Sequence, residues 1–308
     1  MSVPVIDFRD FYSADANKRS RFIEALGAGL EKFGFVAVSH HGIDVDLLRQ
    51  CYLNAQSTFA LPNEVKRRYE TAQDGRQRGY TSMSVEHAKD FDVPDLKEFW
   101  HVGRNLPADH ALQLTGDVPR NQWPEEQPAF ERSFSVLYRT MEAFAHSLLD
   151  AIGVYLELPH NFFSDLVHDG NSIMRVIHYP PLGPDAPANA VRAAAHEDIN
   201  LITVLPVSTQ PGLELLTRDG QWMAVSPPAD VMVCDTGDMM QLLTGGRLPS
   251  TTHRVVNPDG DAAEKSRYSL PFFVHPHPDR TLEPLVGQAE PITAREFLHR
   301  RLVDIGLA

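Results

Sequence analysis

The sequence predicts a mainly β core with flanking helices, and two observations predict it. From about residue 172, short runs rich in β-branched and aromatic residues recur between Gly, Pro, Asp and Asn. About eight short strands at this spacing indicate a β-sandwich, jelly roll or barrel. The first half instead has apolar residues at helical spacing. Because the 308 residues show no repeat and no Gly/Ser-rich linker, we expect one catalytic domain over 1–308: a mainly helical region (1–170), the β core (171–278) and a C-terminal helix (279–308).

Two apolar stripes mark the helices of the first half, because their members recur every three or four residues. They consist of Phe22, Ile23, Leu26, Leu30 and Phe33, and of Phe130, Phe134, Leu137, Met141, Phe144, Leu148 and Ile152. Short strand-like runs lie among these helices: Val3 to Phe8, Gly34 to Ser39 and Phe99 to Val102.

The second half supplies the core strands and a closing helix. The predicted strands are Ser172 to Tyr179, Ile199 to Val207, Leu213 to Leu216, Trp222 to Val225, Val231 to Cys234, Met239 to Leu243, His253 to Val256 and Tyr268 to Val274. Near the end, Thr293 and Glu296 have the spacing of a capping box, with Ile292 and Phe297 placed as a hydrophobic staple. These signals predict a helix that starts after Thr293.

Composition and charge restrict the class of partner. The net charge of −13 disfavours binding to a phosphate backbone, and the basic stretch Lys66-Arg67-Arg68 is interpreted as a solvated helix face. No run of about 18 apolar residues predicts a membrane span, and the first residues lack the pattern of a secretion signal. Cys51 and Cys234 have no metal or redox spacing and are expected to be buried. We therefore expect a cytoplasmic protein, as a monomer, with no nucleic-acid or membrane partner.

The sharpest local signal is His196-Glu197-Asp198. Side chains at positions i and i+2 of a strand point to the same face, so an imidazole and a carboxylate would converge there, and Asn200 would share that face. An isolated H-x-D is weak, and a third ligand is needed; His253, on a later predicted strand, is the best candidate. Two histidines and one carboxylate leave positions open on an octahedral metal, which suits iron(II) and O₂ chemistry, although zinc also accepts such ligands.

A candidate anion clamp follows His253. Arg267 and Ser269 lie two residues apart on a predicted strand, so a guanidinium and a hydroxyl face the same space. The guanidinium matches a carboxylate in shape and charge, and in a buried pocket this pair would hold the remote end of a dicarboxylate. Phe273 shares their parity.

Nearly the whole chain then resembles the isopenicillin-N-synthase-like branch of the iron(II)/2-oxoglutarate dioxygenases. The resemblance rests on segments in a fixed order. They are VPVIDF (3–8), GFVAVSHHGI (34–43), KEFWHVGR (97–104), MRVIHYPPL (174–182), HEDINLITVL (196–205), QPGLEL (210–215), W-x-A-V (222–225), DTGDMMQLLTGGRLPSTTHRVV (235–256) and RYSLPFFVHP (267–276).

The resemblance implies a jelly-roll (double-stranded β-helix) core. It matches His196, Asp198 and His253 to the metal ligands, and Arg267 with Ser269 to the pair that binds the C5 carboxylate of 2-oxoglutarate. It also matches Tyr179 to a tyrosine that often contacts the co-substrate. The chain departs from the family in two places. Ile177 stands where the family often has Asn, and the polar turn from Pro258 to Lys265 makes the segment after His253 longer than usual; we expect this turn to leave the site unaffected.

The implied activity is oxidation of an unidentified small molecule by hydroxylation, desaturation or cyclisation. It would require iron(II), 2-oxoglutarate and O₂, with succinate and CO₂ as co-products. Phe99 and His101 lie on a strand expected to approach the pocket and, with Asn200 and Phe273, are candidate substrate contacts. The alternatives are an oxidase of this branch that does not use 2-oxoglutarate, an ethylene-forming type, and a non-catalytic metal-binding jelly roll.

The primary substrate cannot be read from the sequence. Arg78, Arg104 and Arg192 could each bind a substrate carboxylate, but each is more simply interpreted as a surface cation.

Overall fold

A large mixed sheet and a smaller antiparallel sheet form the core of the computed structural model, which describes residues 2–71, 75–83, 85, 95–182, 191–258, 260–287 and 289–304. The large sheet has the order β1-β2-β10-β7-β13-β5-β4-β3, with β12 paired to β5. Its strands are β1 (Val5–Asp7), β2 (Phe35–Ser39), β3 (Gly79–Thr81), β4 (Glu98–Gly103), β5 (Ile173–Tyr179), β7 (Ile202–Pro206), β10 (Val231–Thr236), β12 (Arg267–Ser269) and β13 (Phe272–Val274).

The small sheet has the order β6-β11-β8-β9. It consists of β6 (Ala193–His196), β8 (Leu213–Leu216), β9 (Trp222–Ala224) and β11 (His253–Val255), and a separate pair is formed by β14 (Thr281–Leu282) and β15 (Ile292–Thr293). One buried cluster joins Phe99 and Ile177 of the large sheet to Val255 of the small one. A second joins Phe35 to Leu215. The small sheet therefore packs on one face of the large sheet, as a jelly roll requires.

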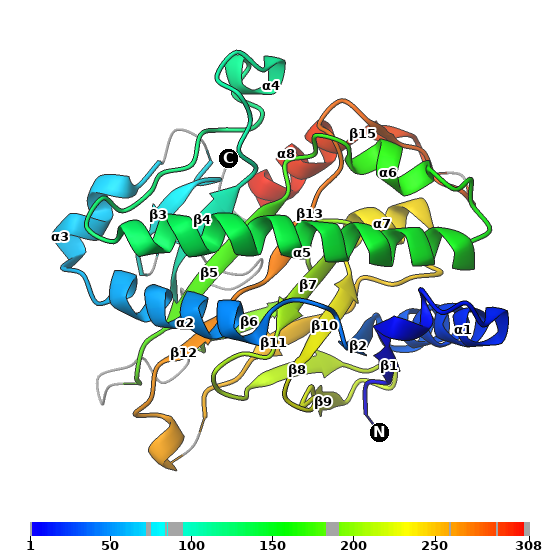
Figure 1. Ribbon diagram of the computed structural model, residues 1–308, viewed down its shortest axis with the longest axis horizontal. Helices are drawn as coiled ribbons and strands as arrows, with labels where there is room; N and C mark the ends of the chain where they lie inside the picture. Colours follow the sequence, from blue (N-terminus) through cyan, green and yellow to red (C-terminus); the bar gives the residue numbers. More distant parts are fainter. Residues whose placement is uncertain are drawn as a thin grey trace.

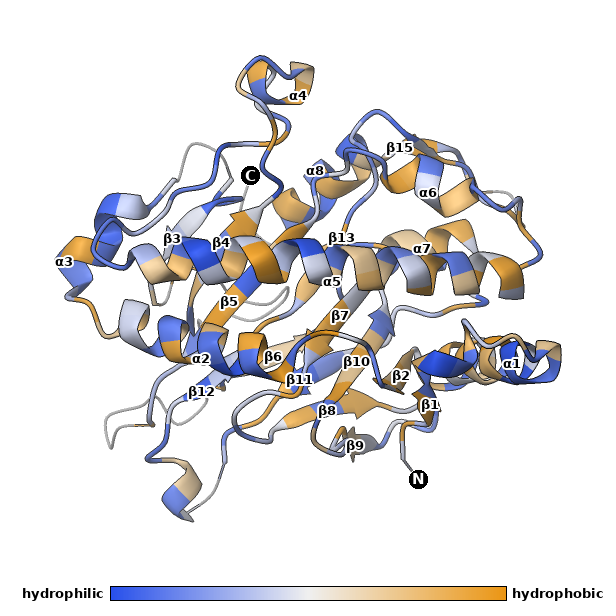
Figure 2. Cartoon of the chain, viewed as in Figure 1, coloured by the Kyte–Doolittle hydropathy of each residue, from blue (hydrophilic) through white to orange (hydrophobic). Residues whose placement is uncertain are grey.

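Helices cover the opposite face of the large sheet (Figure 1). Helix α5 (Pro128–Tyr155) lies over the middle of the sheet with α2 (Val45–Phe59) beside it, and α1 (Ala16–Phe33) packs against β1 and β2. The other helices are α3 (Asn63–Lys66), α4 (Ala111–Leu114), which projects away from the sheet, α6 (Phe162–Val167), α7 (Asp238–Leu243) and α8 (Ala294–Asp304). Figure 2 shows apolar residues concentrated in the central strands and hydrophilic residues around the periphery. No helix among the described residues is long and apolar enough to cross a membrane.

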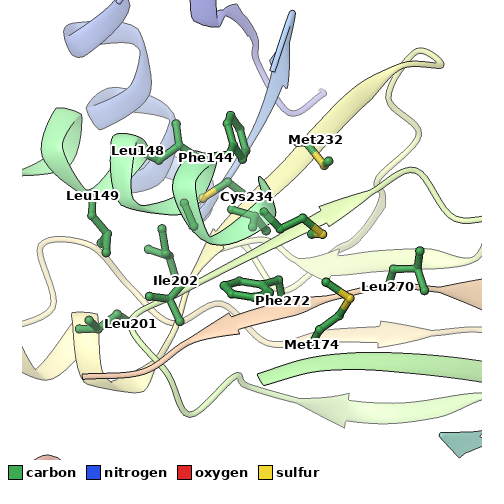
Figure 3. Close-up of a cluster of buried hydrophobic side chains, with 14 of the residues drawn as sticks. Phe144, Leu148, Leu149, Met174, Leu201, Ile202, Met232, Cys234, Leu270 and Phe272 are labelled. Carbon is green, nitrogen blue, oxygen red and sulfur yellow. The ribbon is translucent and has the colours of Figure 1, made fainter. Parts of the chain in front are cut away.

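Helix α5 carries the predicted apolar stripe onto the sheet. Its side chains Phe144, Leu148 and Leu149 lie over Ile202 and Phe272 of the central strands (Figure 3). Each of these residues is almost completely buried. Successive strand residues point to opposite faces, so the strands that anchor α5 on one face send alternate residues into the space between the sheets.

The C-terminal helix forms as its sequence signals predict. The Glu296 amide donates to the Thr293 hydroxyl at 3.2 Å, while the Glu296 carboxylate accepts from the Thr293 amide at 3.4 Å. This reciprocal capping box starts α8 at Ala294. Ile292 and Phe297 both pack against the main core.

Four predictions about the elements are wrong. The run Met239 to Leu243 is helical, because short apolar runs are ambiguous by period and here Met239, Met240 and Leu243 are buried at helical spacing. The run Tyr268 to Val274 is split into β12 and β13 around Pro271, which has no amide hydrogen. The predicted strand from Ile199 begins only at Ile202, after a loop. The solvated face predicted for Lys66-Arg67-Arg68 is wrong for Lys66, which is buried and ion-paired with Glu98 at 2.6 Å, whereas Arg67 and Arg68 are exposed.

Candidate active site

His196, Asp198 and His253 meet between the two sheets. His196 ends β6 and His253 begins β11, and the two are cross-strand partners with ring centroids 4.4 Å apart. The nearest Asp198 carboxylate oxygen lies 3.9 Å from His196 Nε2 and 3.8 Å from His253 Nε2. One ligand atom from each residue lies within 4.8 Å of the others. Among the described residues this is the one group of His, Cys, Asp or Glu side chains placed to hold a metal ion.

Both imidazoles are oriented by backbone carbonyls. Nδ1 of His196 lies 2.8 Å from the Ala194 oxygen, and Nδ1 of His253 lies 3.1 Å from the Thr251 oxygen. A carbonyl can only accept, so each Nδ1 carries the hydrogen and each Nε2 keeps its lone pair for a ligand. The His196 side chain is 35% exposed, against 10% for Asp198 and 11% for His253, so the site is open on the His196 side.

Asp198 reaches this position from a loop. Strand parity predicted that the Asp198 carboxylate would lie beside His196, but β6 ends at His196 and residues 197–201 are not strand. Helix α7 holds this loop: the Asp238 amide donates to the Asp198 carbonyl at 2.8 Å and the Met239 amide to the Asn200 carbonyl at 3.1 Å. The free amides of a helix N-terminus are suited to this task.

Gly237 allows α7 to approach this closely. A Cβ at this position would lie 2.6 Å from Asn200 Oδ1 and 2.7 Å from the Asp198 carbonyl oxygen. Both distances are shorter than a carbon–oxygen contact allows, so a larger residue would displace the loop. The glycine is therefore required for close approach and not for an unusual backbone angle, since its φ is −104°.

The side chains around Asp198 form a small polar network. The Thr203 hydroxyl donates to Asp198 Oδ2, and Asn200 donates its amide to the Ile202 carbonyl at 2.8 Å and to Thr203 Oγ1 at 3.1 Å. Asn200 is 1% exposed. Its amide is thus committed to the loop, and this favours a positioning role over the predicted substrate contact.

Burial controls the charge of the groups around the site. Desolvation, followed by the neighbouring His253, lowers the pKa of His196, which favours the neutral imidazole that a metal ligand must be. Asp235, a cross-strand partner of Thr203, is buried, and desolvation together with Asp198 raises the pKa of its carboxyl well above the usual range.

Arg267 and Ser269 lie on β12, and Tyr179 opposite Arg267 packs against Ala193 of β6 and Val255 of β11, the strands that carry the two histidines. Arg267 is 2% exposed and is the cross-strand partner of Tyr179, whose ring lies 4.9 Å from the guanidinium carbon. Its Nε donates to the Gln210 carbonyl and its Nη2 to Ser208 Oγ, at 3.0 and 2.9 Å. Nη1 is buried and has no hydrogen-bond partner in the described part of the chain. An orphaned cationic donor of this kind is suited to an anionic ligand.

Phe99, His101 and Phe273 gather around Arg175, a residue that the sequence analysis missed. The Arg175 guanidinium carbon lies 4.3 Å from the Phe99 ring and 5.4 Å from the Phe273 ring, and its Nε lies 2.7 Å from His101 Nε2. Ile177 pairs with Phe99 on one side and with Ser269 on the other. It therefore lies between the aromatic cluster and the Arg267 clamp.

The three arginines interpreted as surface cations are not on the surface. Arg78 and Arg192 are fully buried, and Arg104 is 17% exposed in an ion pair with Glu142. Their burial had no sequence signal, because a cation's burial depends on partners distant in the chain.

A cavity of about 330 Å³ lies beside α8, lined by Met239, His275 and Leu298 among others, but no residue of the His–Asp–His cluster lines it.

The fold and the cluster define a class. A jelly roll with two histidines and a carboxylate between its sheets has the ligand set of the non-haem iron(II) oxygenases, and the buried arginine fits a carboxylate co-substrate.

Comparison with known proteins gives the family. The model of the 2OG-Fe(II) oxygenase superfamily matches residues 170–276, and that of the non-haem dioxygenase in morphine synthesis N-terminal region matches residues 3–126. The 2-oxoglutarate-Fe(II) type oxidoreductase hxnY of Emericella nidulans is 30% identical over 283 residues, which are 90% of this chain and 80% of that protein. The chain therefore belongs to the 2OG-Fe(II) oxygenase superfamily.

Solved structures agree. A 2OG-Fe(II) oxygenase family protein from Caulobacter crescentus is 41% identical and aligns over 98% of both chains, with a TM-score of 0.87. A full-length Neurospora crassa protein, solved in complex with alpha-KG, is 25% identical over 97% of this chain and 95% of that chain, with a TM-score of 0.85. These findings confirm the predicted jelly roll and an enzyme that depends on iron(II), 2-oxoglutarate and O₂.

Proposed function

We propose that His196, Asp198 and His253 hold the iron(II), and that Arg267 and Ser269 hold the C5 carboxylate of 2-oxoglutarate beside Tyr179. One observation carries this proposal: three ligand atoms lie within 4.8 Å of one another, and the strands that carry the two histidines pack against Tyr179, the cross-strand partner of a buried, unfilled guanidinium donor. The residues fit both groups. Two imidazoles and one carboxylate leave coordination positions open, and Arg267 lies too deep to be satisfied by bulk water.

Bound iron(II) and 2-oxoglutarate supply the oxidising chemistry, which uses O₂ and releases succinate and CO₂. The protein would supply the groups that position 2-oxoglutarate. Gln210 and Ser208 fix two edges of the Arg267 guanidinium, so its free Nη1 is aimed before the ligand arrives. The Ser208 hydroxyl donates to Ser269 Oγ at 3.1 Å, which leaves the Ser269 hydrogen free to donate to the carboxylate.

The primary substrate is proposed to be a small molecule that lies against Phe99, His101 and Phe273. Arg175 is held over both phenylalanine rings and beside His101, so this wall offers flat apolar surface together with cationic donors. The Neurospora crassa protein has also been solved with alpha-KG and thymine, which supports a flat polar substrate. Hydroxylation, desaturation or cyclisation would then depend on which substrate atom faces the metal. Asn200 is proposed to position Asp198.

Metal content and co-substrate turnover test the ligand set. In His253→Ala and Asp198→Ala, we expect loss of bound iron(II) and of succinate formation from 2-oxoglutarate, because each change removes a ligand. His160→Ala is the matched control, since His160 is exposed in the turn between α5 and α6, and it should behave like the wild type. Full iron binding and succinate formation in Asp198→Ala would contradict the proposal.

We also propose that the chain acts in the cytoplasm as one catalytic domain and as a monomer, without nucleic-acid or membrane partners. The positions of β2 and β4 inside the large sheet support one domain, because the first 170 residues share the sheet of the core. The net charge of −13 disfavours polyanions. Light scattering after size exclusion tests the monomer: a mass near 34.4 kDa is expected, and a mass near twice that would contradict it.

A further inference from the structure

Arg192 is a second buried cation beside the clamp. It precedes β6, and its side chain is fully buried. Its Nη2 donates to the Lys265 carbonyl at 2.9 Å, two residues before Arg267, and its backbone amide donates to Asn257 Oδ1 at 3.0 Å. Arg192 therefore approaches the start of β12 from the small sheet, whereas Arg267 lies on the large one.

The donors of Arg192 are not satisfied by the protein. In the described part of the chain its Nε and Nη1 are buried without a hydrogen-bond partner, and Nη1 of Arg267 shares this state. Two buried guanidinium groups near each other repel, and burying an unpaired charge is costly unless an opposite charge arrives. Desolvation and the neighbouring Arg267 both lower the pKa of Arg192, which agrees with two cations facing one desolvated space.

The position of Arg192 favours the co-substrate over the primary substrate as the source of that charge. Its contacts are with the turn that leads into Arg267, and Arg267 is the neighbouring cation that acts on it. The aromatic wall proposed for the substrate has its own cation, Arg175. A carboxylate offers about four lone-pair positions. Arg267 Nη1 and the Ser269 hydroxyl fill two, which leaves acceptors for the open donors of Arg192.

We propose that Arg192 binds the C5 carboxylate of 2-oxoglutarate together with Arg267, so that two arginines from opposite sheets select a dicarboxylate co-substrate. This inference rests on the proposed role of Arg267. It also gives a function to the end of the long polar turn, Pro258 to Lys265, which was expected to leave the site unaffected: the Lys265 carbonyl orients Arg192. Asp259 of that turn lies outside the described residues.

Calorimetric titration of the iron(II)-loaded protein without O₂ tests the proposal. The ligands are 2-oxoglutarate and 2-oxovalerate, a five-carbon 2-oxo acid without the C5 carboxylate. We expect Arg192→Met to raise the Kd for 2-oxoglutarate about ten- to a hundred-fold, the loss expected for a hydrogen bond between charged groups. The Kd for 2-oxovalerate should stay as in the wild type, and Arg192→Lys should restore part of the affinity. The melting temperature of the ligand-free Arg192→Met protein should not fall, because an unpaired buried charge is removed.

Matched variants separate the outcomes. Arg254→Met is the control, because Arg254 lies on the small sheet with its own carboxylate partner, Glu214, at 2.8 Å, and should leave both Kd values unchanged. An unchanged Kd for 2-oxoglutarate in Arg192→Met, or an equal loss for both ligands, would overturn the inference. Should Arg192→Met not fold, Arg192→Gln decides, because it removes the charge and keeps polar atoms, and wild-type affinity for 2-oxoglutarate in it overturns the inference. An unchanged Kd for 2-oxoglutarate in Arg267→Met would instead overturn the proposed function.

Discussion

Asp198 is held by more of the protein than either histidine. Its backbone carbonyl accepts from the first turn of α7, and its outer oxygen accepts from Thr203, which Asn200 holds in turn. This network leaves the inner carboxylate oxygen facing both imidazoles. Removing a group that orients a metal ligand in this way typically weakens metal binding about ten- to a hundred-fold.

Replacing Thr203 by Val removes the hydrogen bond to Asp198 at nearly constant volume. We expect the Kd for iron(II) to rise about ten- to a hundred-fold, because the carboxylate loses the group that orients it. Anaerobic metal titration measures this change, and Thr203→Ser, which keeps the hydroxyl, should stay close to the wild type. Equal affinity in the Val and Ser variants would show that the hydroxyl does not position Asp198.

At the scale of elements, two helical glycines have opposite surroundings. A Cβ on Gly153, in α5, would meet only Phe163 at ordinary contact distance, 3.5 Å. A Cβ on Gly29, in α1, would lie 2.5 Å from Val36 Cγ1 and 2.9 Å from Pro4 Cγ. Position 29 thus requires glycine because α1 packs closely on β1 and β2, whereas no contact requires glycine at position 153.

This contrast predicts stability changes of opposite sign. Gly153→Ala should raise the free energy of unfolding by about 0.5–1 kcal/mol, since alanine loses less backbone entropy in a helix. Gly29→Ala should lower it by about 1–3 kcal/mol through overpacking. Denaturant unfolding of both variants is the measurement, and a destabilised Gly153→Ala protein would show that α5 is packed more tightly than described.

The helices whose signals are local in the sequence could be predicted, and features that depend on distant neighbours could not. The period of the apolar residues predicted α5, and the capping box predicted α8, because both signals are local. Helix α7 was predicted as a strand, since five residues are too few to separate the two periods. An isolated H-x-D is a weak signal, so His196, Asp198 and His253 were matched to one another through the family resemblance, and the loop that carries Asp198 was not predicted. Arg175 was missed and Arg192 was interpreted as a surface cation, because the burial of both depends on neighbours that are distant in the sequence.

At the scale of the whole molecule, titratable side chains such as that of His275 are buried in the interior, away from water. His275, at the end of β13, is 8% exposed, and burial lowers the pKa of its imidazole to about 4. An unfolded chain titrates near the ordinary value of 6.5, so the unfolded state takes up the proton first as pH falls. The stabilising contribution of neutral His275 is therefore complete above pH 6.5 and is lost as pH falls toward 4.

The metal-free protein should accordingly unfold more readily in mild acid. Between pH 6.5 and 4.5, the wild type should lose up to about 1.4 kcal/mol of stability per pH unit from this residue. His275→Asn should show a shallower pH dependence by that amount, measured by urea unfolding at each pH. Parallel curves for the two proteins would mean that His275 does not titrate in this window.

The central claim is that one interior site holds iron(II) and 2-oxoglutarate through named side chains. Visible absorption without O₂ tests it most directly: metal-free protein receives iron(II) and then 2-oxoglutarate, with Arg267→Ala and Asp198→Ala beside it. We expect a metal-to-ligand charge-transfer band that saturates with 2-oxoglutarate in the wild type, needs far more 2-oxoglutarate in Arg267→Ala and is absent in Asp198→Ala. A wild type that binds iron but gives no band, or an Arg267→Ala protein that saturates at the wild-type concentration, would contradict the proposed site.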